Sequence, residues 1–154
     1  MKLLMVCLGN ICRSPMAEGI MKAMLKEKGL DWEVASSGIN GYHTGESPHP
    51  SSQKVCKQHG YDISSQRATR FASEDFEDYD KIYVMAADVY RDVIRLAPYN
   101  AAKEKVSFFL EDLYSGTQKD VLDPWFGGDE GYLPVFKEIE AGCKSILENL
   151  ISKY

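Results

Sequence analysis

The chain has 154 residues, of which 44% are hydrophobic and 27% charged, which is typical of one globular domain, and we expect that domain to span residues 1–154. Its net charge of −5 leaves no basic stripe that could displace counterions from a phosphate backbone, and so excludes nucleic acid as a partner. No apolar run approaches the roughly 20 residues that cross a bilayer, and too few apolar residues follow Met1-Lys2 for a signal peptide, so we expect no membrane partner and a cytoplasmic location.

A short apolar run opens the chain at Lys2 to Val6 and predicts a strand that is buried on both faces of a parallel sheet. The octet CLGNICRS, Cys7 to Ser14, follows at once. Because a loop that leads from a strand into a helix start presents backbone N–H groups suited to a phosphate anion, we name the octet the phosphate loop. A helix is predicted next, with Ser14 as its N-cap and Pro15 as its first helical position. Apolar residues then recur at three- and four-residue spacing until Gly29 ends the helix.

Strand-like and helix-like patterns alternate along the rest of the chain. This alternation predicts a single-domain α/β fold with a four-stranded parallel sheet and helices on both faces. In the last helix one apolar stripe, Val135, Ile139, Gly142, Ile146 and Leu150, is typical of core. The predicted strands are residues 3–6, 33–36, 81–85 and 105–108, and the predicted helices are residues 15–28, 50–59, 88–96 and 133–152.

The stretch from Glu111 to Gly131 has no clear periodicity and contains several glycines and one proline. Loops of this length without secondary structure are uncommon in compact domains unless they have a function. This one would rise from the carboxyl end of the fourth strand, on the same side as the phosphate loop. Its many acidic residues either select which phosphopeptides approach or form an ordinary solvated surface.

The four cysteines, Cys7, Cys12, Cys56 and Cys143, lack the even spacing of a secreted disulfide framework. We therefore expect free thiols in a reducing compartment. A zinc site made of Cys7, Cys12, Cys56 and His59 is set aside because the spacing fits no usual structural pattern, and no metal is expected.

The phosphate loop pairs a cysteine with an arginine in a position suited to anion binding. Successive backbone N–H groups and a helix N-terminus attract a phosphate dianion and favour the thiolate form of Cys7, the expected nucleophile. The planar fork of Arg13 can hold two phosphate oxygens at once, as a clamp. The alternative is a buried structural cysteine beside a surface arginine.

Three motifs carry a resemblance to the low-molecular-weight protein tyrosine phosphatases: CLGNICRS, the SSG of Ser36 to Gly38, and the dipeptide Asp123-Pro124. The resemblance implies a flavodoxin-like fold, of the phosphotyrosine phosphatase I-like kind, with the first and last motifs on one rim. It also implies a cysteine-dependent protein-tyrosine-phosphatase that uses no cofactor and forms a cysteinyl-phosphate. Its substrates would be phosphotyrosine-containing proteins and small aryl phosphates.

The Asp-Pro match makes Asp123 the expected general acid, and afterwards the base that activates water. Without that match, one aspartate in an acidic loop would more often be a solvated charge. Pro124 biases the residue before it towards extended backbone. In the resembling family, the hydroxyl at the position of Ser14 also stabilises the departing thiolate.

Other residues of the phosphate loop are expected to support its shape. Gly9 permits backbone angles that other residues resist, and the Asn10 side chain can tie a tight loop to itself. Cys12 either protects Cys7 through a reversible disulfide or is a small buried thiol.

Apolar side chains around the phosphate loop would form a slot that favours a long, flat phosphoaryl group over phosphoserine. The alternative is plain core, above all for Leu8. Relatives often carry two tyrosines after Asp-Pro, where this chain has Trp125 and Phe126. They also often carry Asp at the position of His49, Asp at the position of Ala86 and, in some cases, His at the position of Gln66. The expected wall residues are Leu8, Ile11, Tyr42, Trp125 and Phe126.

Three other functions remain open at the level of sequence. Phosphoarginine phosphatases share this scaffold, but they usually carry Thr where this chain has Ile11. Arsenate reductases of the same fold need a closely spaced pair of further cysteines, whereas Cys56 and Cys143 lie far apart in the sequence. A module that only binds phosphotyrosine should have lost Cys7 or Asp123, and both are present.

Overall fold

The computed structural model describes residues 1–126 and 128–154, without the side chain of Phe126. Its centre is a four-stranded sheet with the strand order β2-β1-β3-β4, in which every neighbouring pair is parallel. This order agrees with the flavodoxin-like arrangement, so the predicted fold class is confirmed. The strands are β1 (Lys2–Cys7), β2 (Glu33–Gly38), β3 (Lys81–Val84) and β4 (Val106–Phe108).

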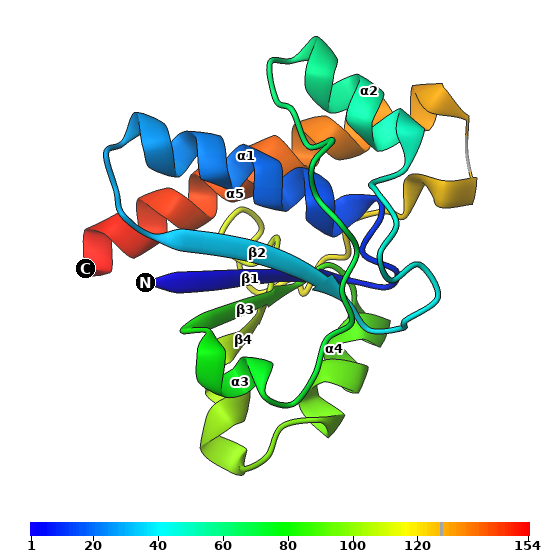
Figure 1. The fold of residues 1–154 in the computed structure, drawn as a ribbon. Coiled ribbons are helices and arrows are strands. Elements are labelled where there is room, and N and C mark those ends of the chain that lie inside the picture. The colour runs from blue at the N-terminus through cyan, green and yellow to red at the C-terminus, as the bar shows by residue number, and fades with distance from the viewer. Residues whose placement is uncertain (127) are drawn as a thin grey trace.

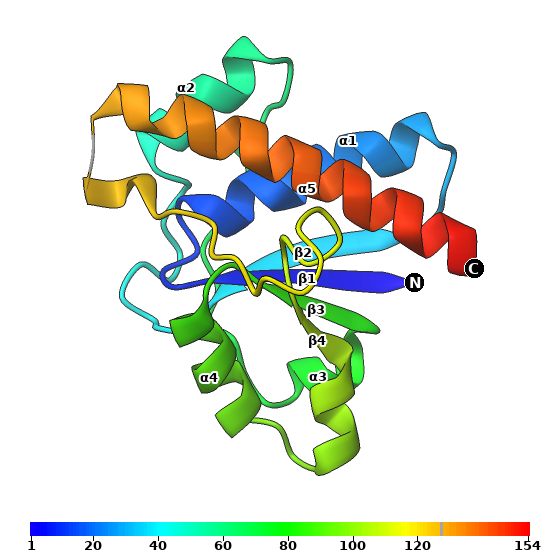
Figure 2. The ribbon, with the colours of Figure 1, turned by 180° about the vertical axis from the view of Figure 1, so that it is seen from behind.

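Helices cover both faces of the sheet (Figure 1). One face carries α1 (Arg13–Glu27), α2 (Pro50–Gln58) and α5 (Tyr132–Lys153), and the other carries α3 (Asp75–Asp78) and α4 (Ala87–Arg95). Figure 2 shows from behind how α5 runs across the sheet beside α1. No helix within the described residues is both long and apolar enough to span a membrane.

β1 is buried on both faces because its side chains alternate between two cores. Leu3 and Met5 belong to the core under α1 and α5, whereas Leu4 and Val6 belong to the core on the side of α3 and α4. A strand covered on both faces is expected to be a continuous apolar run, as the KLLMV segment is.

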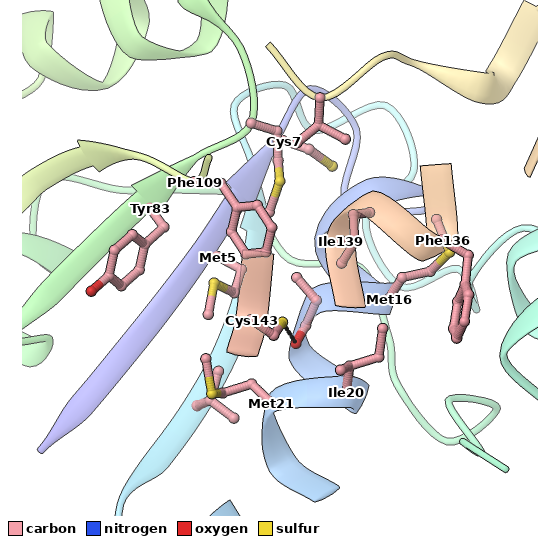
Figure 3. Close-up of a cluster of buried hydrophobic side chains, with 14 of the residues drawn as sticks. Met5, Cys7, Met16, Ile20, Met21, Tyr83, Phe109, Phe136, Ile139 and Cys143 are labelled. Carbon is pink, nitrogen blue, oxygen red and sulfur yellow. Dashed lines mark hydrogen bonds between the residues drawn. The ribbon is translucent and has the colours of Figure 1, made fainter. Parts of the chain in front are cut away.

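The apolar stripe of α5 is core, as predicted. Its five members are all buried, and Figure 3 shows Ile139 and Cys143 of this helix facing α1 and the sheet. A Cβ atom on Gly142 would lie 2.5 Å from the ring of Phe109. Glycine therefore lets α5 approach the aromatic residue that follows β4.

The carboxyl ends of the strands meet at one edge, and both chain termini lie at the opposite end of the sheet (Figure 1). At this edge Cys7 pairs with Gly38, and the phosphate loop passes directly over β2. A Cβ atom on Gly38 would lie 2.7 Å from the carbonyl carbon of Gly9 and 2.8 Å from the nitrogen of Asn10. Because Gly38 has no side chain, the backbone of the phosphate loop can pack directly against β2 at this position.

Several boundaries differ from those predicted. The start of α1 is wrong, because the helix begins at Arg13 and not at Pro15, and Cys12 occupies the N-cap position without capping through its side chain. Ser14 cannot be the N-cap because its hydroxyl is engaged by Cys7 and Asn10. The sequence also missed α3 and the 3₁₀ helices at Asn100–Lys105, Pro124–Phe126 and Asp129–Gly131, which are too short to show periodicity.

Candidate active site

A cavity of about 240 Å³ opens at the carboxyl edge of the sheet, where ligands bind in open α/β folds. The phosphate loop forms its floor, and the segments after β2 and before η2 (Pro124–Phe126) form its walls. The residues lining it are Cys7, Leu8, Gly9, Ile11, Cys12, Arg13, Asn40, Tyr42, His43, Asp123 and Trp125.

Cys7 is the last residue of β1, and it is buried at the base of this cavity. Figure 3 shows it at the end of the strand, above the core that contains Met5 and Phe109. Its Sγ lies 2.9 Å from Ser14 Oγ. A hydroxyl at this distance is in hydrogen-bonding contact with the sulfur, and Ser14 makes this contact instead of capping α1.

Asn10 holds the phosphate loop in its curved shape. Its backbone has a φ of 60°, a left-handed conformation that asparagine tolerates better than most residues. Its Nδ2 donates to Ser14 Oγ (2.8 Å) and to Ser36 Oγ (2.9 Å), and its Oδ1 accepts from the Thr69 backbone N–H (2.9 Å). The buried amide therefore uses three of its hydrogen-bonding positions to tie the loop to β2 and to the segment after α2.

Gly9, which precedes Asn10, was predicted to permit backbone angles that other residues resist, but its role in the structure is different. Gly9 does not take the left-handed φ that would require glycine. A Cβ atom there would lie 3.1 Å from Cδ2 of His43, so the absence of a side chain makes room for the histidine ring against the loop.

Backbone N–H groups of the phosphate loop are available to an anion. Within the described part of the chain, those of residues 8 to 13 donate no hydrogen bond outside the helices and strands, and no side chain caps α1. A curved run of such amides that leads into a helix N-terminus is an anion-binding concavity. Cys7 lies at its base.

Arg13 is buried, with a side chain only 5% exposed. Its Nη1 donates to the Val121 carbonyl (3.0 Å), and its Nη2 lies 3.6 Å from Asp123 Oδ2. The carbonyl fixes the plane of the guanidinium, and the carboxylate balances its charge. The sequence contained no sign of the contact with Val121, because a backbone acceptor leaves no signature in residue type.

Asp123 lies in the segment 120–126, which we name the acid loop. Its Oδ1 accepts from the Trp125 backbone N–H (3.0 Å), and the side chain is 30% exposed. The carboxylate therefore faces the cavity and is accessible to solvent. Val121 N–H donates to the Met85 carbonyl at the end of β3 (2.7 Å), which anchors the start of this segment to the sheet.

Cys12 is a buried thiol within the phosphate loop. Burial raises its pKa to about 11, although a hydrogen bond with Tyr132 opposes this shift. Its Sγ lies 3.5 Å from Tyr132 Oη, and all four cysteines of the chain are free. Cys12 is thus a neutral thiol near neutral pH.

The structure brings most of the predicted wall residues to the cavity. Leu8, Ile11, Tyr42 and Trp125 line it, and Leu8 is exposed and therefore not plain core. The side chain of Phe126 lies outside the described residues. Sequence reasoning missed Asn40 and His43, which also line the cavity. Their place just after the carboxyl end of β2 was the available signal, since ligand-binding residues follow strand ends at such an edge.

The described residues contain no group of three or more His, Cys, Asp or Glu side chains arranged to hold a metal ion. The ionisable side chains in the lining of the cavity include Arg13, Asp123 and Cys7. Such a set can bind an anion, attack it with sulfur and transfer a proton.

Known proteins resemble this chain over nearly its whole length. The model of the family described as low molecular weight phosphotyrosine protein phosphatase matches residues 2–154. A candidate low molecular weight protein-tyrosine-phosphatase of Synechocystis sp. is 38% identical and is covered to 96%, with 97% of this chain matched. A protein tyrosine phosphatase structure from Entamoeba histolytica, with Hepes in the active site, matches with a TM-score of 0.92 at 32% identity, covering 99% of this chain and 98% of that one. Vibrio vulnificus Wzb in complex with benzylphosphonate matches with a TM-score of 0.86 at 26% identity, covering 96% and 97%.

Proposed function

The chain belongs to the low molecular weight phosphotyrosine protein phosphatase family, and from this premise we propose that it hydrolyses phosphotyrosine in proteins, and small aryl phosphates, through a cysteinyl-phosphate on Cys7. One observation carries the proposal. The Cys7 Sγ lies 2.9 Å from a hydroxyl at the base of a cavity whose lining also holds the Arg13 and Asp123 pair. Nucleophile, clamp and acid thus share one concave site.

In the first step, the phosphate binds to the loop amides and to Arg13, and the Cys7 thiolate attacks phosphorus. The sulfur–phosphorus bond forms while the bond to the aryl oxygen breaks. Asp123 protonates the departing oxygen, which lowers the barrier most for a poor leaving group. Arg13 and the amides stabilise the charge on the equatorial oxygens of phosphorus in the transition state.

In the second step, water attacks the phosphorus of the cysteinyl-phosphate. The Asp123 carboxylate, formed in the first step, accepts a proton from this water. The sulfur–phosphorus bond breaks, and Ser14 Oγ–H donates a hydrogen bond to the departing thiolate, to which it already lies close. The products are inorganic phosphate and the starting form of the enzyme, so the cycle closes with water as the sole co-reactant and needs no cofactor.

The cavity supports an aryl substrate. Leu8, Ile11, Tyr42 and Trp125 give it apolar walls, which suit a flat ring more than a short phosphoserine side chain. Ile11 offers no hydroxyl to the polar guanidinium of phosphoarginine. The Vibrio vulnificus relative binds benzylphosphonate, in which an aromatic ring and a phosphonate are one carbon apart.

The two alternative chemistries lack support in the cavity. Arsenate reduction on this scaffold needs a closely spaced pair of further thiols, but Cys56 and Cys143 are both fully buried outside the cavity. Burial raises the pKa of Cys56 to about 12, which makes it a poor nucleophile. A phosphotyrosine-binding module has no use for the acid, which this site retains. Four free thiols also fit the reducing cytoplasm, where we place the enzyme.

The decisive assay compares the wild type with Cys7→Ser, Asp123→Asn and the matched control Cys56→Ser, a buried cysteine outside the site. The substrates are an aryl phosphate, a phosphotyrosine peptide, phosphoarginine, and arsenate with a thiol reductant. We expect turnover of the first two by the wild type and by Cys56→Ser, and none by Cys7→Ser. Equal rates for the wild type and Cys7→Ser would remove the enzyme proposal, and preference for phosphoarginine would replace its substrate class.

A further inference from the structure

His49 stands at the N-terminus of α2, where it links this helix to the phosphate loop. Its backbone N–H donates to the Ile11 carbonyl (2.8 Å). Its ring Nδ1 accepts from the Ser51 backbone N–H (3.1 Å) and so caps α2. Nδ1 is thus the acceptor that caps α2.

The ring of His49 lies between two aromatic side chains. It stacks on Tyr132, with centroids 5.4 Å apart and planes 16° apart, and meets Trp125 nearly edge-on, with centroids 5.2 Å apart and planes 75° apart. Tyr132 is buried at the start of α5, and its Oη lies 3.3 Å from Nδ1 of His49. The buried Tyr132 ring therefore holds the His49 ring in place. The His49 ring in turn packs against Trp125.

Trp125 connects this cluster to the reaction. Its side chain lines the cavity and is 43% exposed, while its backbone N–H holds Oδ1 of Asp123 at 3.0 Å. Side chains from outside the acid loop contact Asp123 and Trp125. Arg13 lies 3.6 Å from Asp123, and the rings of His43 and His49 contact Trp125.

We infer that His49 is a positioning residue for proton transfer: its ring holds Trp125 in place and, through the Trp125 backbone, directs the Asp123 carboxylate to the leaving-group oxygen. The inference rests on the proposed function, because it assigns Asp123 the role of general acid. A cap alone would need no aromatic ring, since asparagine or aspartate caps a helix as well. The ring is what the contacts with Trp125 and Tyr132 require.

Two substitutions separate the ring from the cap. His49→Asn keeps a side-chain acceptor for the Ser51 N–H and loses the ring contacts, whereas His49→Phe keeps a ring of similar shape and loses the acceptor. The readout is kcat/KM for phenyl phosphate, a poor leaving group, divided by kcat/KM for nitrophenyl phosphate, a good one. This ratio reports protonation of the leaving group and is insensitive to a general loss of folded enzyme.

For His49→Asn we expect the ratio to fall about tenfold, a part of the 10²–10⁴-fold that general acids contribute. His49→Phe should keep the ratio within about twofold of the wild type, because a ring still packs against Trp125. Inhibition by inorganic phosphate should be unchanged in both, because the loop amides and Arg13 are untouched. In an Asp123→Asn background, adding His49→Asn should change the ratio no further, because the group it positions is already gone.

An unchanged ratio in His49→Asn, an equal fall in His49→Phe, or an equal fall in the Asp123→Asn background would each overturn the inference and leave the proposed function intact. If His49→Asn does not fold, His49→Phe decides alone: retention of the ratio supports the ring, and loss overturns it. A wild-type ratio in Asp123→Asn itself would remove Asp123 as the acid, and the inference would fall together with that part of the proposed function.

Discussion

Replacing Gly38 by alanine adds one methyl group where β2 passes under the phosphate loop. The new Cβ atom would lie 2.7 Å from the Gly9 carbonyl carbon, 2.8 Å from the Asn10 nitrogen and 3.0 Å from the Leu8 oxygen. All three are backbone atoms, so no side-chain rotation can relieve the clash. Either the strand or the loop has to move.

The size of the movement follows from these distances. Ordinary contact begins near 3.4 Å, so the loop must shift by about 0.7 Å, and overpacking of this kind costs about 1–3 kcal/mol. For a domain of this size, each kcal/mol lowers Tm by about 2–4 °C. A displacement near 1 Å in a catalytic group lowers activity on the order of 10²-fold, so Gly38→Ala should lose most of its kcat/KM at temperatures where it is still folded.

The measurement pairs a thermal unfolding curve with kcat/KM on an aryl phosphate. Gly131→Ala is the matched control, because its Cβ atom would meet nothing within 4 Å and its φ of −71° suits alanine. It should behave like the wild type. If Gly38→Ala kept both the wild-type Tm and the wild-type kcat/KM, the close approach of β2 to the phosphate loop would be refuted.

Three further outcomes are expected. Arg13→Lys loses the planar fork and its contact with the Val121 carbonyl, and kcat/KM should fall about 10²–10³-fold; an aryl phosphatase assay with near-wild-type activity would contradict the clamp. Because burial raises the pKa of Cys12 to about 11, its reactive thiolate is scarce below that pH and grows as pH rises towards it. In Cys7→Ser, iodoacetamide should therefore leave Cys12 unlabelled at about pH 7, and peptide mass spectrometry showing rapid labelling there would argue against this. Gly142→Ala drives a methyl group into the Phe109 ring and should cost about 1–3 kcal/mol in urea unfolding with kcat/KM unchanged; wild-type stability would show that the helix can shift freely.

The sequence was most informative where local pattern and chemistry coincide. The apolar KLLMV run, the octet that follows it and the helical spacing after it predicted β1, the phosphate loop and α1 in their observed order. The four parallel strands followed from the alternation of patterns. Cys7 and Arg13 of the phosphate loop and the distant Asp123 do line one cavity, although their roles in catalysis remain a proposal.

The remaining features depend on contacts that residue order does not reveal. Ser14 was expected to cap α1, but its hydroxyl has a better partner in Cys7, which reaches it only when the loop is folded. Gly9 and Gly38 are needed for space against His43 and the loop backbone, whereas sequence reasoning offers only conformational freedom for glycine. The His49 cluster joins the starts of α2 and α5 with the acid loop, and no local periodicity connects such distant segments.

Rapid-quench mapping of the phosphorylated enzyme tests the central chemical claim most directly. The wild type and Asp123→Asn are mixed with nitrophenyl phosphate, whose good leaving group departs without the acid, then quenched in acid during turnover, digested and examined by peptide mass spectrometry. The account predicts one phosphoryl group on the peptide that contains Cys7, and more of it in Asp123→Asn, because the base that activates water is missing. A phosphoryl group on any other residue, or none during demonstrable turnover, would contradict it.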